Sequence, residues 1–282
     1  MVLARSVTAS PGGGFIGLAA AREVGAEVGL LSVLGTGPNS YMARKTLRRH
    51  HIDILSEEVV GDIGVAIQLV EGNGSTTVIL STGIESEPPI DSIASIPVQP
   101  GDVVLAHGAA MAYPEVAVRY AQWVSHLPED VTVVLCPSPM IDQVPASVWP
   151  SMLQRANIVT TNLRESSLLP HVLAMNPNGP TVEECLRDDV IQVRRMGAMG
   201  CEYRIGRCGE PVLIPAFPVD PVDTAGVGDT HVAVMCGLLA QGWALDDALL
   251  TANAAGAVMI SHSTTLPIPT MAEIERVMAY EI

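Results

Sequence analysis

Short apolar runs rich in β-branched residues alternate with longer helical patterns through the middle of the chain, and this rhythm constrains the fold more than any other feature. The strand-like runs are 103–106, 131–136, 158–161 and 190–194, and the helical patterns cover 114–125 and 144–155. Strands that are separated by helical crossovers usually pair in parallel within one sheet. With 282 residues, 48% of them hydrophobic, the chain can bury both faces of such a sheet. The sequence therefore predicts an α/β fold with a mostly parallel central sheet.

Two strand-like runs break this rhythm. Residues 64–70 and 75–81 are joined through Glu71-Gly-Asn-Gly74, whose Asn-Gly pair favours a tight hairpin turn. Ligand sites in open α/β sheets lie beyond the carboxyl ends of the strands, so a small β-flap there could close over a substrate. We expect one domain over residues 1–282, with a β-lid around residues 60–83.

The charge balance limits the partners. Fifteen basic and thirty acidic side chains give a net charge of −15, which repels phosphate backbones and anionic lipid surfaces. We therefore expect a small-molecule substrate, with neither nucleic acid nor a membrane as partner. The longest apolar stretch, 16–35, is interrupted by charges, so it does not predict a transmembrane helix, and the first residues do not resemble a secretory signal.

The cysteines indicate the compartment. Five cysteines, with no CxxC spacing, occur in a chain too large to depend on disulfides. They indicate reduced thiols in a cytoplasmic protein.

A glycine-rich segment, Asp223-Thr-Ala-Gly-Val-Gly-Asp229, lies directly before an apolar helical pattern over 230–241. Because Gly226 and Gly228 lack side chains, the backbone amides of 226–228 can approach a phosphate at the positive end of the helix dipole. Asp229 would fall in the first helical turn, where its carboxylate could accept the proton of an attacking hydroxyl. The segment is not a Walker A loop, because Asp follows the second glycine. The competing interpretation makes Asp229 an ordinary helix N-cap.

A second glycine cluster invites a different function. Gly12-Gly-Gly14-Phe-Ile-Gly17 satisfies the Gly-x-Gly-x-x-Gly pattern of dinucleotide-binding proteins. However, residues 1–10 make a poor strand, and the strand expected over 28–34 is not followed by the acidic residue that would bind ribose hydroxyls. The glycine cluster therefore gives only weak support to a dehydrogenase, which ranks below the two functions described next.

The segment Asp223–Asp229 resembles the signature of the ribokinase (PfkB) family of carbohydrate kinases. That resemblance implies a three-layer ribokinase-like fold and ATP-dependent transfer of the γ-phosphoryl group to a hydroxyl of a sugar or nucleoside-like molecule. It assigns Asp229 as the general base and Gly226, Val227 and Gly228 as the anion hole. It also implies Mg²⁺ as cofactor and a monovalent cation such as K⁺ near Asp223.

The glycine cluster near the N-terminus resembles the same family. Its di-glycine segment lets the backbone approach the sugar, which implies that Gly12, Gly13, Gly14 and Ile16 lie at the substrate. The family usually carries Asn at the position of Ile16, and an isoleucine cannot form the hydrogen bond that the amide makes. The acceptor is therefore not identified by the sequence.

The pair Asn162 and Glu165 resembles the Asn-x-x-Glu of the family, whose members organise magnesium and the phosphates. Oxygen ligands suit Mg²⁺, here through bound waters. Without the neighbouring motifs, the same spacing would be a helix-capping arrangement more often than a metal site.

Two more segments resemble the nucleotide site of the family. Gly197 and Gly200 match its Gly-x-x-Gly turn, although a simple hairpin turn is a comparable interpretation. Asn253, Gly256 and Ala257 match the helix of small residues beside the adenine, although small residues can also serve close helix packing.

Three further positions complete the expectations. Relatives begin with a strand whose aspartate binds sugar hydroxyls, and only eleven residues precede Gly12 here, so we expect that strand to be absent and a sheet edge to be exposed. Such an edge, or the lid, could form a homodimer.

His107 ends a strand but is treated as structural, and Cys136 replaces a common Asp as a buried thiol. Because the position of Ile16 lacks the usual Asn and the N-terminal aspartate is expected to be absent, the second functional hypothesis is a pseudokinase that binds sugar or nucleotide without turnover.

Overall fold

The protein is built on a six-stranded sheet with the order β10-β9-β8-β7-β6-β5. The structure, a computed structural model, describes residues 9–70, 76–176, 178–262 and 268–279. The strands of this sheet are β5 (Val103–His107), β6 (Thr132–Cys136), β7 (Ile158–Asn162), β8 (Ile191–Arg195), β9 (Cys201–Ile205) and β10 (Val212–Ile214). Strands β5 to β8 run parallel, whereas β9 and β10 continue the sheet in antiparallel fashion. The mostly parallel sheet predicted from the sequence is confirmed.

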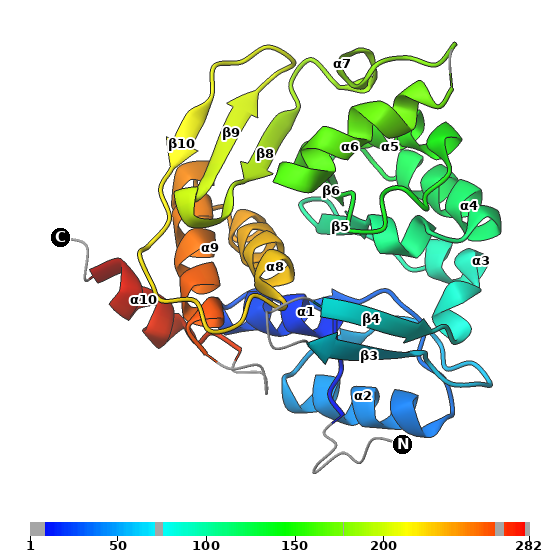
Figure 1. Ribbon diagram of the computed structural model, residues 1–282. Helices are drawn as coiled ribbons and strands as arrows, with labels where there is room; N and C mark the ends of the chain where they lie inside the picture. The colour runs from blue at the N-terminus through cyan, green and yellow to red at the C-terminus, as the bar shows by residue number, and fades with distance from the viewer. Residues whose placement is uncertain (1–8, 71–75, 177, 263–267, 280–282) are drawn as a thin grey trace.

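Helices cover both faces of the sheet, which makes three layers (Figure 1). The longer helices are α1 (Gly14–Glu23), α2 (Pro38–Arg49), α4 (Pro114–Ser125), α5 (Trp149–Arg155), α6 (Leu163–Ala174), α8 (Val227–Ala240), α9 (Leu245–Ile260) and α10 (Met271–Ala279); the short ones are α3 (Ile90–Ala94) and α7 (Val182–Cys185). Helices α8 and α9 bury apolar side chains against one face of the sheet. Helices α4, α5 and α6 do so against the other.

The small residues of α1 bring the N-terminal part of the chain against α8. A Cβ atom on Gly17 would lie 3.1 Å from the Cβ of Ala233 and 3.2 Å from the carbonyl oxygen of Asp229. A larger side chain at Gly17 would push the two helices apart. The glycine cluster ahead of α1 is thereby held close to the first turn of α8.

Two sequence expectations about element boundaries were wrong. The helix expected over 144–155 begins only at Trp149, after a short 3₁₀ turn over Ala146–Val148. Pro145 and Pro150 explain this, because a proline lacks the N–H that a helix interior needs. The strand expected over 28–34 is reduced to β1 (Gly29–Leu30), which pairs in parallel with β2 (Asp53–Ile54). The pairing then stops and returns only as one bridge between Gly35 and Val59.

The expected β-flap is present as the antiparallel pair β3 (Val65–Val70) and β4 (Thr76–Ser81), which is not part of the central sheet. The turn expected at 71–74 lies outside the described residues. Both faces of the hairpin expose apolar side chains: Ile67 and Ile79 are paired on one face, and Leu80 lies on the other. In Figure 1 the hairpin lies beside α1 and above α2.

Strand β5 is the outer strand of the central sheet among the described residues, and β1 and β2 form a separate pair. The expectation that a first strand is absent concerns residues 1–8, which lie outside the described part of the chain. No helix among the described residues is both long and apolar enough to cross a membrane.

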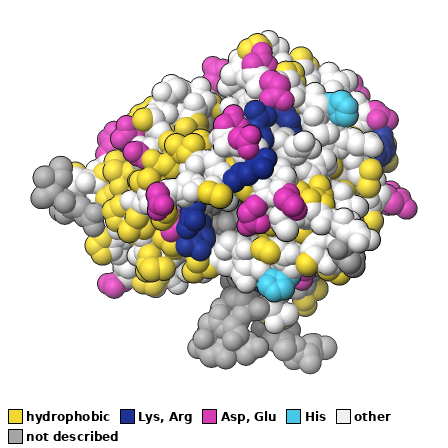
Figure 2. Space-filling model, turned by 90° about the horizontal axis from the view of Figure 1, so that it is seen from above, with side chains coloured by type: hydrophobic (Ala, Val, Ile, Leu, Met, Phe, Trp, Pro, Cys, Tyr) yellow, Lys and Arg dark blue, Asp and Glu magenta, His cyan; other side chains and the backbone are white. Residues whose placement is uncertain are grey.

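The surface in Figure 2 shows basic side chains flanked by acidic ones, next to an extended apolar area.

Candidate active site

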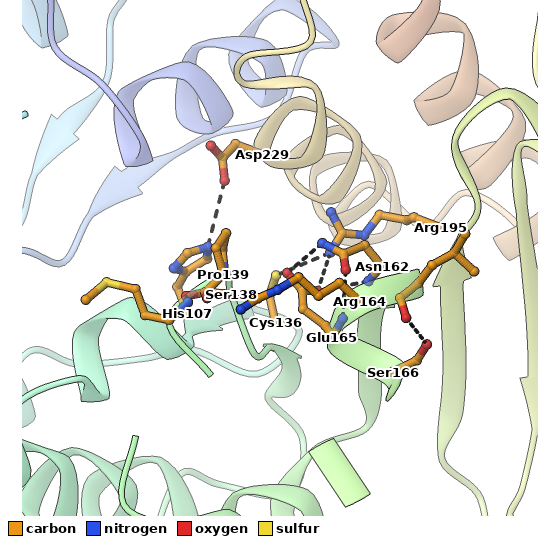
Figure 3. Close-up of polar contacts among 12 residues, drawn as sticks. His107, Cys136, Ser138, Pro139, Asn162, Arg164, Glu165, Ser166, Arg195 and Asp229 are labelled. Carbon is orange, nitrogen blue, oxygen red and sulfur yellow. Dashed lines mark hydrogen bonds and ion pairs between the residues drawn. The ribbon is translucent and has the colours of Figure 1, made fainter. Parts of the chain in front are cut away.

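The four parallel strands end in side chains that carry chemistry. His107, Cys136, Asn162 and Arg195 are the last residues of β5, β6, β7 and β8, respectively. Because the strands are parallel and adjacent, these side chains gather at one edge of the sheet. The N-terminus of α8 faces the same edge and adds Asp229 to the group (Figure 3). The site thus combines strand ends with the start of a helix.

The first turn of α8 presents backbone donors without partners. Gly226 is the N-cap residue with φ 74°, a left-handed conformation that favours glycine, and no side chain caps the helix. Among the described residues, the N–H groups of Gly226, Gly228 and Asp229 have no hydrogen-bond acceptor, and that of Val227 makes only a 3.5 Å contact to the Thr224 oxygen. The loop therefore has the free donors of an anion-binding helix terminus.

Asp229 points from the first turn of α8 toward His107. The Asp229 Oδ1 and His107 Nε2 atoms lie 3.8 Å apart, and both side chains are about one-third exposed, at 37% and 35%. Burial raises the pKa of Asp229 above its usual value, while the charges of His107 and Arg195 oppose this rise. Burial also lowers the pKa of His107, against the attraction of Asp229. A partly exposed carboxylate with a raised pKa is suited to accept a proton.

Asn162 and Glu165 form a capping box at the start of α6. The Asn162 Oδ1 atom accepts the N–H of Glu165 at 2.8 Å, and Glu165 Oε2 accepts the N–H of Asn162 at 2.9 Å. The Asn162 amide also donates to Glu165 Oε1 at 2.9 Å. The capping alternative is therefore present. Glu165 is 2% exposed, so its carboxylate is closed off from bulk solvent.

Glu165 has a further partner on the neighbouring strand. Arg195 Nη2 donates to Glu165 Oε2 at 3.0 Å, and the same nitrogen lies 3.8 Å from the sulfur of Cys136. Cys136 is buried, as expected from the sequence, and burial raises the pKa of its thiol to about 11. The thiol is therefore protonated at neutral pH and does not compete with Glu165 for the guanidinium charge.

Gly197 and Gly200 form the turn between β8 and β9. Both have positive φ values, and the N–H of Gly200 donates to the Gly197 oxygen at 2.9 Å. A Cβ atom on Gly200 would lie 2.2 Å from the Ile214 oxygen, whereas one on Gly197 would meet nothing within 4 Å. Gly200 is therefore required by the local fold, and Gly197 leaves open space beside the site.

The amide of Asn253 is directed into the protein. It donates to the oxygens of Ile214 and Pro215 at 3.1 and 2.9 Å, and its Oδ1 lies 3.0 Å from His231 Nε2. Burial lowers the pKa of His231 to about 3, so the ring is neutral. The donors and the acceptor of the Asn253 amide are thus engaged within the protein, although the family resemblance places this residue beside the adenine.

The other two positions of that segment are also buried. Gly256 and Ala257 lie inside α9, and a Cβ on Gly256 would be 3.4 Å from Val227. The small residues allow α9 to pack closely against the anion-binding turn.

The N-terminal glycines lie at the start of α1. Gly12, Gly13 and Gly14 are exposed, and a Cβ on any of them would meet open space. Ile16, by contrast, is buried, and a Cβ on Gly226 would lie 3.0 Å from its Cδ1 atom. Ile16 therefore supports the anion-binding turn with apolar contact.

Asp223 lies just ahead of the same turn. Its Oδ1 atom accepts the N–H of Ala225 at 2.9 Å, and its own N–H lies 3.3 Å from the Ile260 oxygen. The carboxylate thus shapes the loop that leads into Gly226.

The polar groups of the site decide whether it suits a nucleotide phosphate and a divalent cation. The uncapped first-turn amides of α8 and the positive-φ glycines in the turn between β8 and β9 fit a nucleotide phosphate. The described residues contain no group of three His, Cys, Asp or Glu side chains that could hold a metal. A divalent cation therefore fits this site only when phosphate and water supply most of its ligands.

Two residues of the site were not predicted. His107 was treated as structural, and Arg195 was not singled out. Their shared signal is position, because each ends a parallel strand next to other polar strand ends. That signal becomes visible only when the strand order is known.

Comparison with known proteins gives the family. The model of the pfkB family carbohydrate kinases matches residues 1–271. The uncharacterized sugar kinase YegV of Escherichia coli strain K12 is 27% identical over 260 residues, covering 90% of this chain and 79% of that protein.

Solved structures show the same fold. A ribokinase from Thermotoga maritima superposes with a TM-score of 0.77 at 16% identity, covering 99% of this chain and 91% of that one. A fructokinase from Vibrio cholerae O395, solved with fructose, ADP and a calcium ion, gives 0.73 at 17% identity, covering 94% and 89%. The three-layer arrangement is thus the ribokinase fold. The chain belongs to the pfkB family of carbohydrate kinases, which are phosphotransferases with an alcohol group as acceptor.

Proposed function

We propose that this protein transfers the γ-phosphoryl group of ATP to a hydroxyl of a sugar or a related small molecule, with Asp229 as the general base. The observation that carries the proposal is the position of the Asp229 carboxylate, which lies in the same first turn of α8 as the free backbone N–H groups and points toward His107 at the strand ends. A base beside an anion hole is the arrangement that phosphoryl transfer to an alcohol requires.

In the proposed reaction, Asp229 accepts the proton of the acceptor hydroxyl as its oxygen forms a bond to the γ-phosphorus. The bond between that phosphorus and the bridging oxygen of ADP breaks, and ADP leaves with the electron pair. The backbone N–H groups of Gly226 and Gly228 stabilise the negative charge on the transferred group, with Val227 as the residue between them. Burial of Asp229 assists because a raised pKa makes its carboxylate a better proton acceptor.

The acceptor side is proposed from the glycine cluster. Gly12, Gly13 and Gly14 leave room for a sugar to approach the backbone at the start of α1. Ile16 is buried under the anion-binding turn, so it offers no hydrogen bond to that sugar. Hydroxyl recognition would then depend on backbone groups, which is consistent with a small polyhydroxy acceptor.

The cofactors are proposed as ATP with Mg²⁺. The fructokinase of similar fold holds ADP and a divalent ion, and the uncapped helix terminus here suits the phosphates. Asn162 and Glu165 would contact the ion through water. The open face of Gly197, and close packing at Gly256 and Ala257, would border the nucleotide, with Asn253 fixing the local backbone. A monovalent cation near Asp223 remains part of the proposal.

One assay tests the function. The protein is incubated with Mg-ATP and a panel of pentoses, hexoses, sugar phosphates and nucleosides, and ADP is measured. We expect ADP formation that depends on one acceptor class, and a loss of roughly 10²- to 10⁴-fold in Asp229→Asn. Asp247→Asn is the matched control, because Asp247 is an exposed acid in the first turn of α9. ATP binding without turnover on any acceptor would instead support a pseudokinase.

The β3–β4 hairpin is proposed as a lid over the acceptor and as a dimer contact. Its two faces both expose apolar residues, such as Ile67 at 53% and Leu80 at 51%, so one face could cover the substrate while the other meets a second copy. Sedimentation of the wild type, Ile67→Asp and Leu80→Asp would test this. Unchanged monomers in all three would exclude the dimer.

The free state of the cysteines is the property that bears on the cellular location. Four of the five free cysteines are buried and one is exposed, which suits the reducing cytoplasm that we propose for this enzyme.

A further inference from the structure

Arg195 places a guanidinium beside the anion-binding turn. Side chains alternate along a strand, so the two adjacent arginines of β8 point to opposite sides. Arg194 forms an ion pair with Glu202 on β9, at 2.8 Å. Arg195 points toward α8, and a Cβ built on Gly228 would lie 2.7 Å from its Nη1 atom. Only a glycine at 228 lets the guanidinium come this close to the helix backbone.

The guanidinium is held from one side and free on the other. Its Nη2 atom donates to Glu165, which is itself fixed by the capping box, and the Arg195 side chain is only 13% exposed. Its Nε atom is buried without a partner, and its Nη1 atom makes no hydrogen bond to any described residue. The close-up shows the group between Glu165 and α8 (Figure 3).

A buried cation with unused donors is costly unless an anion completes it. The Arg195 Nη1 donor lies beside Gly228, and the N–H groups of Gly226 and Gly228 are free in the same turn; donors of this kind select negative charge. The net charge of the chain is −15, so an anion reaching this region depends on such a local positive group. These donors together outline a position for a phosphoryl group.

We propose that Arg195 is a catalytic residue that donates from Nη1 to the transferred phosphoryl group, while Glu165 fixes the guanidinium in place. This rests on the proposed kinase function. Arg195 would contact the γ-phosphoryl group of ATP and would lose that contact in ADP. An arginine suits this task better than a lysine, because its planar fork bonds Glu165 and the phosphoryl group at the same time.

Nucleotide binding tests the proposal without relying on turnover. The affinities for ADP and for the non-hydrolysable ATP analogue AMP-PNP, both with Mg²⁺, are measured by calorimetry. A hydrogen bond from a charged group contributes about 1.5–3 kcal/mol, so Arg195→Met should weaken AMP-PNP binding roughly 10- to 100-fold. Its affinity for ADP should change by less than about 3-fold. Arg194→Met, the neighbouring arginine on the other face, should leave both affinities unchanged.

A structural effect of Arg195→Met is separated by a second variant. That substitution leaves the buried Glu165 carboxylate without its cation, which costs stability. The double variant Arg195→Met with Glu165→Gln removes both charges. We expect it to unfold at a higher denaturant concentration than Arg195→Met alone while still failing to prefer AMP-PNP.

The outcomes distinguish the two proposals. If the wild type binds and uses ATP, but Arg195→Met keeps the wild-type ratio of AMP-PNP to ADP affinity, Arg195 does not contact the transferred group. If the wild type binds neither nucleotide, the kinase function fails, and the role of Arg195 fails with it. If the double variant regains the AMP-PNP preference, the guanidinium acts only by balancing Glu165, and the proposal is overturned.

Discussion

Asp229 Oδ1 lies 3.8 Å from His107 Nε2, although the two residues are far apart along the chain. The contact joins the end of the outer parallel strand β5 to the first turn of α8. Burial alone would raise the pKa of Asp229, and a protonated His107 counteracts this rise by attracting the carboxylate. Loss of His107 should therefore raise the pH at which the Asp229 carboxylate is deprotonated.

We expect His107→Leu to move the acid limb of kcat/KM to higher pH. Asp229 must be deprotonated to act, so the rate rises as pH increases through its pKa. Removing the histidine leaves burial less opposed, which raises that pKa further. Rate profiles from pH 4 to 9 would measure the shift, with His126→Leu, at the exposed C-cap of α4, as the control. An acid limb that moves to lower pH would contradict this role.

Substitutions at Gly197 and Gly200 distinguish whether this turn contacts the nucleotide or only joins β8 to β9. Gly197→Ala should cost about 1 kcal/mol, because the left-handed backbone is strained but the space is open. Gly200→Ala should cost more, since its Cβ would overlap the Ile214 oxygen. If the turn borders the nucleotide, Gly197→Ala should also raise the KM for ATP several-fold. An unchanged KM in this folded variant would mean that the turn serves only the β8–β9 hairpin.

Arg155 is predicted to be a major contributor to stability. This 5% exposed residue donates to the oxygens of Leu127, Pro128 and Val131, and to the side chain of Asn157. Arg155→Met would leave those buried acceptors unpaired, so we expect a loss of at least about 3 kcal/mol in the free energy of unfolding. Urea denaturation would measure it.

The control for that experiment is Arg119, which is half exposed and forms an ion pair with Asp91 at 2.6 Å. Because exposed ion pairs contribute little, Arg119→Met should change stability by less than about 1 kcal/mol. Equal effects of the two substitutions would show that the buried network has no special weight.

Thiol reactivity should report the burial of the cysteines. Burial raises the pKa of Cys136 and Cys201 to about 11 and that of Cys236 to about 12, whereas Cys208 is exposed. A thiol reagent at pH 8 should therefore modify one thiol quickly in the native protein, and none quickly in Cys208→Ser. Rapid modification of a second thiol would show that the core opens.

Much of the fold could be predicted because the local signals agree. The helix expected over 114–125 has those bounds in the structure, since Pro114 starts it and its apolar face repeats at helical spacing. The first turn of α8 also contains Asp229, as expected. The strand prediction failed where pairing with another segment decides whether a strand forms. Residues 28–34 have a strand-like sequence, yet only Gly29 and Leu30 pair with β2.

The candidate site was predicted in the same unequal way. The motif Asp223–Asp229 predicted a glycine turn at the start of a helix, which the structure has, because glycine spacing and a following helix are local properties. Asn253 was assigned to the nucleotide, but its amide bonds Ile214, Pro215 and His231 instead. No local pattern reveals such contacts, since they join segments about 20 to 40 residues apart.

The sequence by itself therefore determined the α/β rhythm, the hairpin and the glycine-rich turn at the start of α8, because backbone conformation and apolar periodicity are encoded over a few residues. Only the tertiary structure decided that His107 meets Asp229 and that Arg195 lies beside Gly228. The order of strands in the sheet brings these side chains together, and that order arises from packing between distant segments.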